Sequence, residues 1–355
     1  MIRRTTRVLA TVMAAAVATV VATLPSGCGK ASVTRAAPHT AVIVSGGDAT
    51  SPFTTSDQAC ATGLAAGNTD TAIREYLLKQ GYTVFTSPAM AGRGQVVDQT
   101  GFGAFGVCPI TLPESMTVNS TGSIDTAGEH LARFLTYLHS DKGVGDVDLI
   151  AHSMGGLYAR SAIRVLSTTN APVHVRSLTT IGTPWQGSYL SDYANDNLAL
   201  TDCGGDQLCE KAMGNFKAEV LRLVSGSGRE VSQAYLMGKD GWNQAQSGVL
   251  DQIPVALIGG KKFTGPNPAN PAVWPNDGLV ALRSALAVDI ADPVLPHRRC
   301  YVFDDTHSIF VSNAAGLEWK AALTWDPRVF EVLHQAIDSA PKALEGPNRE
   351  GCPAP

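Results

Sequence analysis

The chain has 355 residues, 44% of them hydrophobic and 16% charged, which is typical of a globular protein and excludes a disordered or fibrous chain. Its formal net charge of −4, without any lysine- and arginine-rich run after residue 35, argues against nucleic acid as a partner. The length allows one large domain or two small ones.

The N-terminal segment has the pattern of an export signal. Three arginines among the first seven residues precede an apolar run of 17 residues at 8–24, which is short for a membrane-spanning helix. We therefore expect a general secretory signal at 1–27, a tether at 28–39, and a secreted or cell-surface protein. Removal of the three arginines shifts the net charge from −4 to −7.

Seven cysteines are an odd number for an exported protein. Cys28 stands where bacterial lipoproteins carry a lipidated cysteine, although Pro25 replaces the leucine usual in such signals. Lipidation with membrane anchoring and a free thiol both stay open. The other six cysteines predict three disulfides in an oxidising compartment, and Cys203 and Cys209 are close enough to link one loop.

Strand and helix patterns alternate from residue 40 onward. Apolar strands are predicted at 40–46, 82–87, 147–152, 175–182, 254–260 and 299–303. Helices are predicted at 69–81, at 154–166 and at 326–337, the last with Asp326 as cap and Pro327 at the first position. A further helix is predicted to start at a capping box formed by Thr126 and Glu129. This order predicts an α/β fold, a mostly parallel sheet with helices on both faces, as one domain over 40–355.

Two segments interrupt the alternation. Residues 88–121 are rich in glycine and proline, and 186–250 form a long insertion with a helix predicted at 209–224. Apolar residues recur at helical spacing on that helix: Met213, Phe216, Val220, Leu223 and Val224. A lid over a binding site and an additional core helix both fit this pattern.

The stretch AHSMG at 151–155 ends one predicted strand and opens a helix. Small residues stand two before and two after Ser153, as a sharp strand–turn–helix elbow requires. Such a turn lifts the serine hydroxyl above the sheet and points it at the helix N-terminus, where a developing oxyanion is stabilised. Ser153 is therefore the candidate nucleophile and the Met154 N–H a candidate oxyanion donor, with a plain turn as the alternative.

A serine nucleophile needs a histidine that takes its proton. The carboxyl ends of parallel strands share one edge of a sheet, so His307, in the loop after the strand at 299–303, is favoured. His297 precedes that strand, and His334 lies within an apolar helix pattern, where packing is its expected role.

The histidine needs a carboxylate to orient it. Asp277, in WPNDGLV downstream of the strand at 254–260, is the candidate, although an Asn-Asp-Gly turn requires no catalytic role. Asp304 and Asp305 stand too near His307 in sequence to orient it easily, and they fit a role in shaping the loop or binding a cation.

The loop after the first strand, VSGGDATS, is expected to supply the second oxyanion donor. A glycine pair lets backbone N–H groups approach a ligand closely, which favours Gly47, with Asp48 as the alternative. A simple turn at Gly46-Gly47 explains the same residues.

Four segments, LIAHSMGGLYAR, IGTPWQGS, PNDGLV and DTHS, in this order resemble the α/β-hydrolase fold, and more narrowly the bacterial secreted triacylglycerol lipases. The resemblance implies a Ser153–Asp277–His307 triad and hydrolysis of carboxylic esters. One departure concerns the oxyanion loop, because the family often has His-Gly after the first strand where this chain has Ser45-Gly46.

Three classes of function fit these residues. A hydrolase of lipids or small esters is favoured, an acyltransferase would use the same triad and acyl-enzyme, and a non-catalytic binding module would have no need to keep all three residues. Trp185 and Tyr189 are candidate walls of an acyl pocket, or packing residues. We expect a monomer without a cofactor, and no zinc-type spacing of histidine and cysteine is present.

Overall fold

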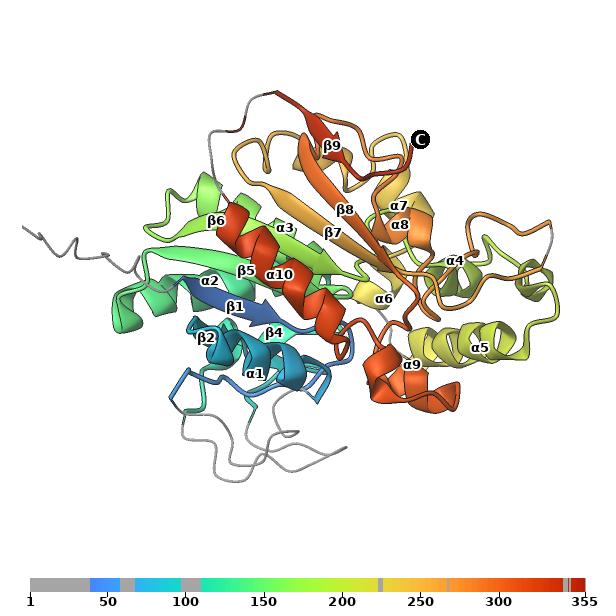
Figure 1. Ribbon diagram of the computed structural model, residues 1–355, viewed down its shortest axis with the longest axis horizontal. Helices are drawn as coiled ribbons and strands as arrows, with labels where there is room; N and C mark the ends of the chain where they lie inside the picture. Colours follow the sequence, from blue (N-terminus) through green and yellow to red (C-terminus); the bar gives the residue numbers. More distant parts are fainter. Residues whose placement is uncertain are drawn as a thin grey trace, which may run out of the picture. The chain divides into compact units, whose positions relative to one another are not determined.

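The computed structural model describes residues 39–57, 68–96, 110–222, 226–266, 268–340, 344 and 346–354. These residues form a fold built on a parallel sheet of seven strands, in the order β2-β1-β5-β6-β7-β8-β9 (Figure 1). The strands are β1 (Thr40–Val44), β2 (Thr83–Thr86), β5 (Asp146–His152), β6 (His174–Ile181), β7 (Val255–Gly260), β8 (His297–Phe303) and β9 (Asn348–Glu350). All neighbouring pairs are parallel, so the carboxyl ends of the strands share one edge. The predicted parallel sheet is confirmed with all six predicted strands, and β9 is an addition to them.

Helices cover both faces of this sheet, as the alternation predicted. Figure 1 shows α1 (Thr71–Lys79) and α10 (Pro327–Ser339) together on one face, and α2 (Ile124–Lys142) and α3 (Gly155–Thr168) behind the other. Successive side chains of a strand point to opposite faces, so Ile43 and Ile150 pack with α1 and α10, whereas Val42 and Leu149 pack with α2 and α3. Two hydrophobic cores, one on each face, therefore hold the sheet in place.

The start of α2 differs from the prediction. The helix begins at Ile124, and Ser123 is its N-cap, accepting a hydrogen bond from the Thr126 N–H at 3.2 Å. The capping box of Thr126 and Glu129 is therefore wrong, because a better cap stands three residues earlier and Glu129 pairs with Arg133 on the surface. The predicted cap of α10 is confirmed, since Asp326 accepts from the Arg328 N–H at 2.8 Å and Pro327 is the first helical residue.

The segment between β6 and β7 is helical. It contains α4 (Tyr189–Ala194), α5 (Gln207–Arg222), α6 (Ser227–Glu230), α7 (Gln233–Met237) and the 3₁₀ helices η3 (Leu200–Cys203) and η4 (Gln244–Gln246). Figure 1 shows α4 and α5 beyond the carboxyl ends of the strands. Met213 of α5 is buried in a small separate core with Tyr189 and Trp274, which fits the core-helix reading of its apolar face. Leu223 and Val224 lie outside the described residues.

Short elements complete the described chain. They are β3 (Ala89–Met90) paired with β4 (Val118–Asn119), α8 (Leu282–Ala285), α9 (Ile309–Ala314), and the 3₁₀ helices η1 (Asn68–Asp70), η2 (Glu114–Met116) and η5 (Trp319–Ala321). Within the described ranges, no helix combines the length and the apolar character needed to cross a membrane.

Two disulfides are present among the described residues. Cys203 pairs with Cys209, as predicted, and Cys300 of β8 pairs with Cys352, just after β9. Disulfides are typical of proteins that function in an oxidising, extracellular environment. The predicted signal at 1–27, Cys28, Cys60 and Cys108 lie outside the described residues.

Candidate active site

Ser153 lies on a sharp turn between β5 and α3. Its φ of 55° is in the left-handed region, which few residues other than glycine adopt. Ser153 N–H donates to the Ile181 carbonyl at 2.8 Å, and Thr183 Oγ1 donates to the Ser153 carbonyl at 2.7 Å. A Cβ at Gly155 would stand 2.6 Å from the Val44 carbonyl oxygen, which explains the small residue there. The turn is thus fixed by both neighbouring strands, and Ser153 remains partly exposed.

His307 and Asp277 form a buried pair at the same edge of the sheet. His307 Nδ1 and Asp277 Oδ2 are 2.7 Å apart, and the two residues are 2% and 0% exposed. The second carboxylate oxygen accepts from the N–H groups of Leu279 and Val280 at 3.0 and 2.8 Å. His307 Nε2 is buried and has no hydrogen-bond partner among the described residues. A histidine held in this way has one nitrogen oriented by a carboxylate and the other free to accept a proton.

His152, directly before Ser153, connects the elbow to His307. The two imidazole rings are 4.7 Å apart between centroids, and His152 Nε2 lies 3.1 Å from the His307 carbonyl oxygen. Burial, together with the nearby His307, lowers the pKa of His152 to about 3. His152 is therefore neutral at ordinary pH, and its Nε2–H donates to that carbonyl. No role was predicted for His152 from the sequence, although it is part of the AHSMG motif.

Gly182, the first residue of the GTPW segment, closes the other side of the site. Its φ is 59°, and a Cβ there would stand 2.9 Å from His307 Nδ1 and 3.1 Å from Asp277 Oδ2. Gly182 belongs to the Gly-Thr-Pro segment that carries the family resemblance, but no role was predicted for it from the sequence.

The residues of the two candidate oxyanion donors, Gly47 and Met154, lie next to each other. A Cβ at Gly47 would stand 2.5 Å from Met154 Sδ, so the loop after β1 passes directly over the first turn of α3. The Asp48 N–H already donates to the Ser120 carbonyl at 3.2 Å. This arrangement favours Gly47 over Asp48 as the residue with an available N–H.

Trp185 and Tyr189 are buried among protein atoms, at 0% and 1% exposure. Trp185 Nε1 donates to Thr180 Oγ1 at 3.1 Å, and the Arg160 guanidinium lies 4.2 Å from a Trp185 ring centroid. Burial lowers the pKa of Arg160 to about 9. The Tyr189 hydroxyl donates to the Gly278 carbonyl at 2.7 Å, next to Asp277. These contacts fit the packing alternative for both residues, and Tyr189 supports the acid loop.

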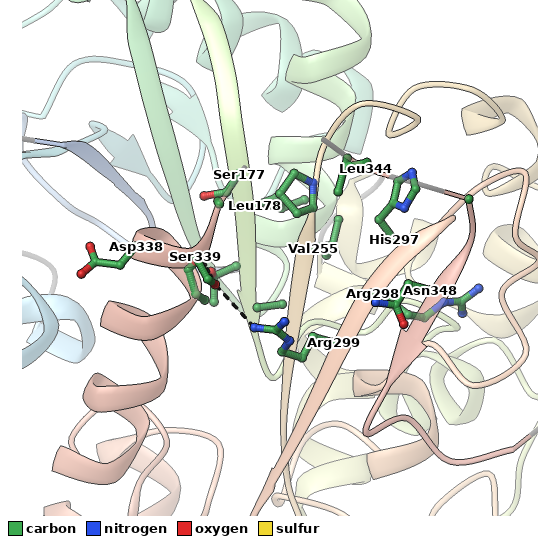
Figure 2. Close-up of a pocket in the computed structure, with 16 residues that line it drawn as sticks. Ser177, Leu178, Val255, His297, Arg298, Arg299, Asp338, Ser339, Leu344 and Asn348 are labelled. Carbon is green, nitrogen blue, oxygen red and sulfur yellow. Dashed lines mark hydrogen bonds between the residues drawn. The ribbon is translucent and has the colours of Figure 1, made fainter. Parts of the chain in front are cut away.

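The alternative histidines lie elsewhere. His334 is on α10 with its ring against Tyr82, and His297 is the first residue of β8, at the amino edge of the sheet. A pocket of about 520 Å³ lies at that amino edge. Figure 2 shows His297 and Arg299 in its wall. Arg299 is already bonded to Ser339 at 3.4 Å and to Glu350 at 2.9 Å. None of the candidate residues Ser153, Asp277 and His307, which lie at the carboxyl edge, lines this pocket.

Asp305 stands two residues before His307, and its side chain is buried. It lies next to Asp326 and 3.5 Å from Arg328. These contacts fit a role in shaping the loop, one of the two roles that the sequence left open for Asp305. Among the described residues, no group of three or more histidine, cysteine, aspartate or glutamate side chains is arranged to hold a metal ion.

The parallel sheet, the elbow after β5 and the His–Asp pair at its carboxyl edge define an α/β-hydrolase fold. Comparison with known proteins agrees with this class: the family described as "Putative serine esterase (DUF676)" matches residues 110–202, a range that includes the elbow.

Relatives of known sequence extend the resemblance to bacterial lipases. The chain is 39% identical over 77 residues to a triacylglycerol lipase of Pseudarthrobacter phenanthrenivorans, covering 22% of this chain and 23% of that protein. A triacylglycerol lipase of Burkholderia plantarii has the same identity over 77 residues, 22% of this chain and 20% of its own length. The chain thus spans less than a quarter of the curated relatives it matches.

A solved structure shares most of the chain length at low identity. The mature form of the Bacillus licheniformis lipase BlEst2 is 16% identical over 85% of this chain and 93% of that one, with a TM-score of 0.48.

Proposed function

We propose that this protein is a serine ester hydrolase, a triacylglycerol lipase or carboxylesterase. One observation carries the proposal. The His307–Asp277 pair is buried, joined at 2.7 Å, and leaves His307 Nε2 without a partner next to the elbow that bears Ser153. The family match over the elbow and the lipase relatives support the same reaction.

In this proposal, Ser153 Oγ attacks the ester carbonyl while His307 Nε2 takes the hydroxyl proton. Asp277 holds Nδ1–H and stabilises the imidazolium that forms. The N–H groups of Met154 and Gly47 donate to the oxyanion of the tetrahedral intermediate. His307 then gives its proton to the leaving alcohol, and the acyl group stays on Ser153. Water attacks this acyl-enzyme with His307 as the base and releases the acid.

A lipid substrate fits the apolar surface near the site. Leu221, in the last turn of α5, is 63% exposed, and Phe310, three residues after His307, is 47% exposed. Glu219 and Arg222, in the same turn of α5, are close enough to Asp48 to act on its carboxyl group electrostatically. The end of α5 therefore lies near the loop that carries Gly47, where an acyl chain would approach Ser153.

Export of the protein is also part of the proposal. The two disulfides fit an oxidising compartment, and the N-terminal sequence has the pattern of a secretory signal followed by Cys28. A lipidated Cys28 would hold the enzyme at the cell surface, and cleavage without lipidation would release it.

Hydrolysis of p-nitrophenyl butyrate and palmitate by the wild type and by Ser153→Ala tests the reaction. We expect Ser153→Ala to lose at least about 10³-fold in kcat, because no other group replaces the nucleophile. Its thermal unfolding should match that of the wild type, since Ser153 is partly exposed and only its Oγ is removed.

The outcomes separate the candidate functions. Preference for palmitate indicates a lipase, and activity confined to butyrate indicates a small-ester esterase. Ester hydrolysis that survives in Ser153→Ala overturns the proposed mechanism. A folded wild type that hydrolyses neither ester contradicts the proposal and directs attention to acyl transfer onto an alcohol.

A further inference from the structure

A buried carboxyl group holds the loop that follows β1. Asp70 accepts a hydrogen bond from Ser45 Oγ, although the two are 25 positions apart in sequence, and a weaker one from Thr69 Oγ1 at 3.3 Å. Ser45 Oγ is also 2.8 Å from Ser51 Oγ, so both ends of the loop meet at one hydroxyl. Ser51 is fixed to β3 by two backbone hydrogen bonds with Ala89, at 2.8 and 2.9 Å.

Stabilisation of a helix does not account for Asp70. The residue stands at the N-cap position of α1, where an aspartate usually accepts from an N–H of the first turn. Its side chain makes no capping hydrogen bond. Instead the carboxyl group faces Ser45 and is 1% exposed.

The position is costly for a carboxyl group. Among the ion pairs of the described residues, none includes Asp70. Burial raises the pKa of Asp70 to about 6, and the hydrogen bonds from Ser45 and Thr69 lower it only in part. A buried carboxyl group without a cationic partner reduces stability. The presence of Asp70 here is therefore better explained by the loop that it holds than by the stability of α1.

We propose that Asp70 is a positioning residue that acts through Ser45 to fix the backbone of Gly46 and Gly47. The inference rests on the proposed function, because it concerns the oxyanion donor of that reaction. Ser45 directly precedes Gly46, and a Cβ at Gly46 would stand 2.6 Å from Ser153 Cβ, so the loop has almost no freedom to move toward the nucleophile. The Ser45–Asp70 contact is the anchor of this loop.

The contact acts on the transition state more than on substrate binding. A backbone N–H aimed at the oxyanion gains most when negative charge develops on the carbonyl oxygen. Loss of the anchor displaces that N–H and lowers kcat, whereas KM changes little.

The test uses Asp70→Leu, Asp70→Asn, Ser45→Ala and the Asp70→Leu/Ser45→Ala double variant. We expect kcat for p-nitrophenyl butyrate to fall about tenfold in Asp70→Leu and Ser45→Ala, with KM within about twofold of the wild type, a smaller effect than outright removal of an oxyanion donor. The double variant should be no slower than the slower single variant, because both remove one contact. Asp70→Asn should restore most of kcat, since its amide oxygen still accepts from Ser45.

Two further measurements separate positioning from a general loss of stability. Inactivation by a p-nitrophenyl phosphonate, whose phosphoryl oxygen occupies the oxyanion position, should slow by the same factor as kcat. Asp192→Leu is the matched control, because Asp192 is another buried carboxyl group with a pKa raised to about 6 by burial, bonded to the Gln233 N–H in the insertion. Its folded fraction should keep the wild-type kcat.

The outcomes distinguish failure of this inference from failure of the proposed function. Wild-type kcat in folded Asp70→Leu or Ser45→Ala, or an equal loss in Asp192→Leu, overturns the inference and leaves the serine esterase intact. Independent, multiplicative effects in the double variant also overturn it. If Asp70→Leu does not fold, Ser45→Ala and Asp70→Asn decide the question. Ester hydrolysis that does not depend on Ser153 overturns the proposed function itself.

Discussion

Gly46 and Gly182 stand at positions of the active site where there is no space for a side chain. A Cβ at Gly46 would overlap Ser153, and one at Gly182 would overlap the ring of His307. Gly182 also has a φ of 59°, whereas Gly46 has an ordinary backbone conformation, so only space excludes a side chain at Gly46. The reacting groups are therefore packed against backbone, which holds them at fixed separations.

Replacement of Gly46 by alanine should reduce kcat by at least about tenfold, because a new methyl group 2.6 Å from Ser153 Cβ displaces either the nucleophile or the oxyanion loop. Steady-state hydrolysis of p-nitrophenyl butyrate measures the effect. Gly145→Ala is the control, since a Cβ there meets nothing within 4 Å. Equal activity of the two variants would contradict the close packing described for Gly46.

At the scale of elements, the pattern of apolar runs was enough to predict the six main strands and the helices α1, α3, α5 and α10. These elements are buried on one face or on both, so their apolar residues recur with the spacing of a strand or of a helix. β9 could not be predicted, because Asn348–Glu350 is polar and partly exposed, and its position depends on pairing with β8 and on the nearby disulfide. The start of α2 was missed because Ser123 and Thr126 are both good caps.

The candidate site was predictable to the same degree. Ser153, Asp277 and His307 could be chosen because residues that follow parallel strands meet at one edge of the sheet. The bond from His152 to the His307 carbonyl and the bond from Ser45 to Asp70 join residues 155 and 25 positions apart. Neither contact produces a local pattern, so both required the folded structure.

The end of α5 provides a prediction about lipid substrates. Leu221→Ser should lower activity on emulsified palmitate esters several-fold and leave soluble butyrate esters within about twofold, because an apolar side chain that is 63% exposed gains about 1 kcal/mol when it enters lipid. Leu200→Ser, at another exposed leucine of the same insertion, is the control. Equal loss on both substrates would mean that Leu221 acts on the fold and not on contact with lipid.

At the scale of the whole molecule, the Asp305–Asp326 pair makes stability depend on pH. Burial and the neighbouring Asp326 carboxylate raise the pKa of Asp305 well above its usual range. The folded protein therefore keeps this proton to a higher pH than the unfolded chain, whose aspartates titrate near 4. The resulting stabilisation is complete below about pH 4, where the unfolded aspartates titrate. It is lost as the pH rises through the folded-state pKa of Asp305.

Asp305→Asn cannot ionise, so its unfolding free energy relative to the wild type should increase between pH 5 and pH 8, by about 1 kcal/mol or more. Urea unfolding at the two pH values measures this difference. Asp304→Asn, whose exposed side chain lies next to Lys262, should show a smaller change over the same range. A difference that is the same at both pH values would show that Asp305 is already ionised at pH 5.

The Cys300–Cys352 disulfide affects whether separate molecules of the protein associate through the edge of the sheet. β9 is one of the two edge strands of the sheet and only three residues long, and Arg299 of β8 is paired with its Glu350. A sheet edge with unpaired main-chain groups is a template on which another chain can add a strand and start an aggregate, and short charged strands are one defence against this. Here the defending strand is tied covalently to the strand that it covers. In oxidising surroundings the edge of β8 stays partly covered, and reduction of this one bond would leave it open to self-association.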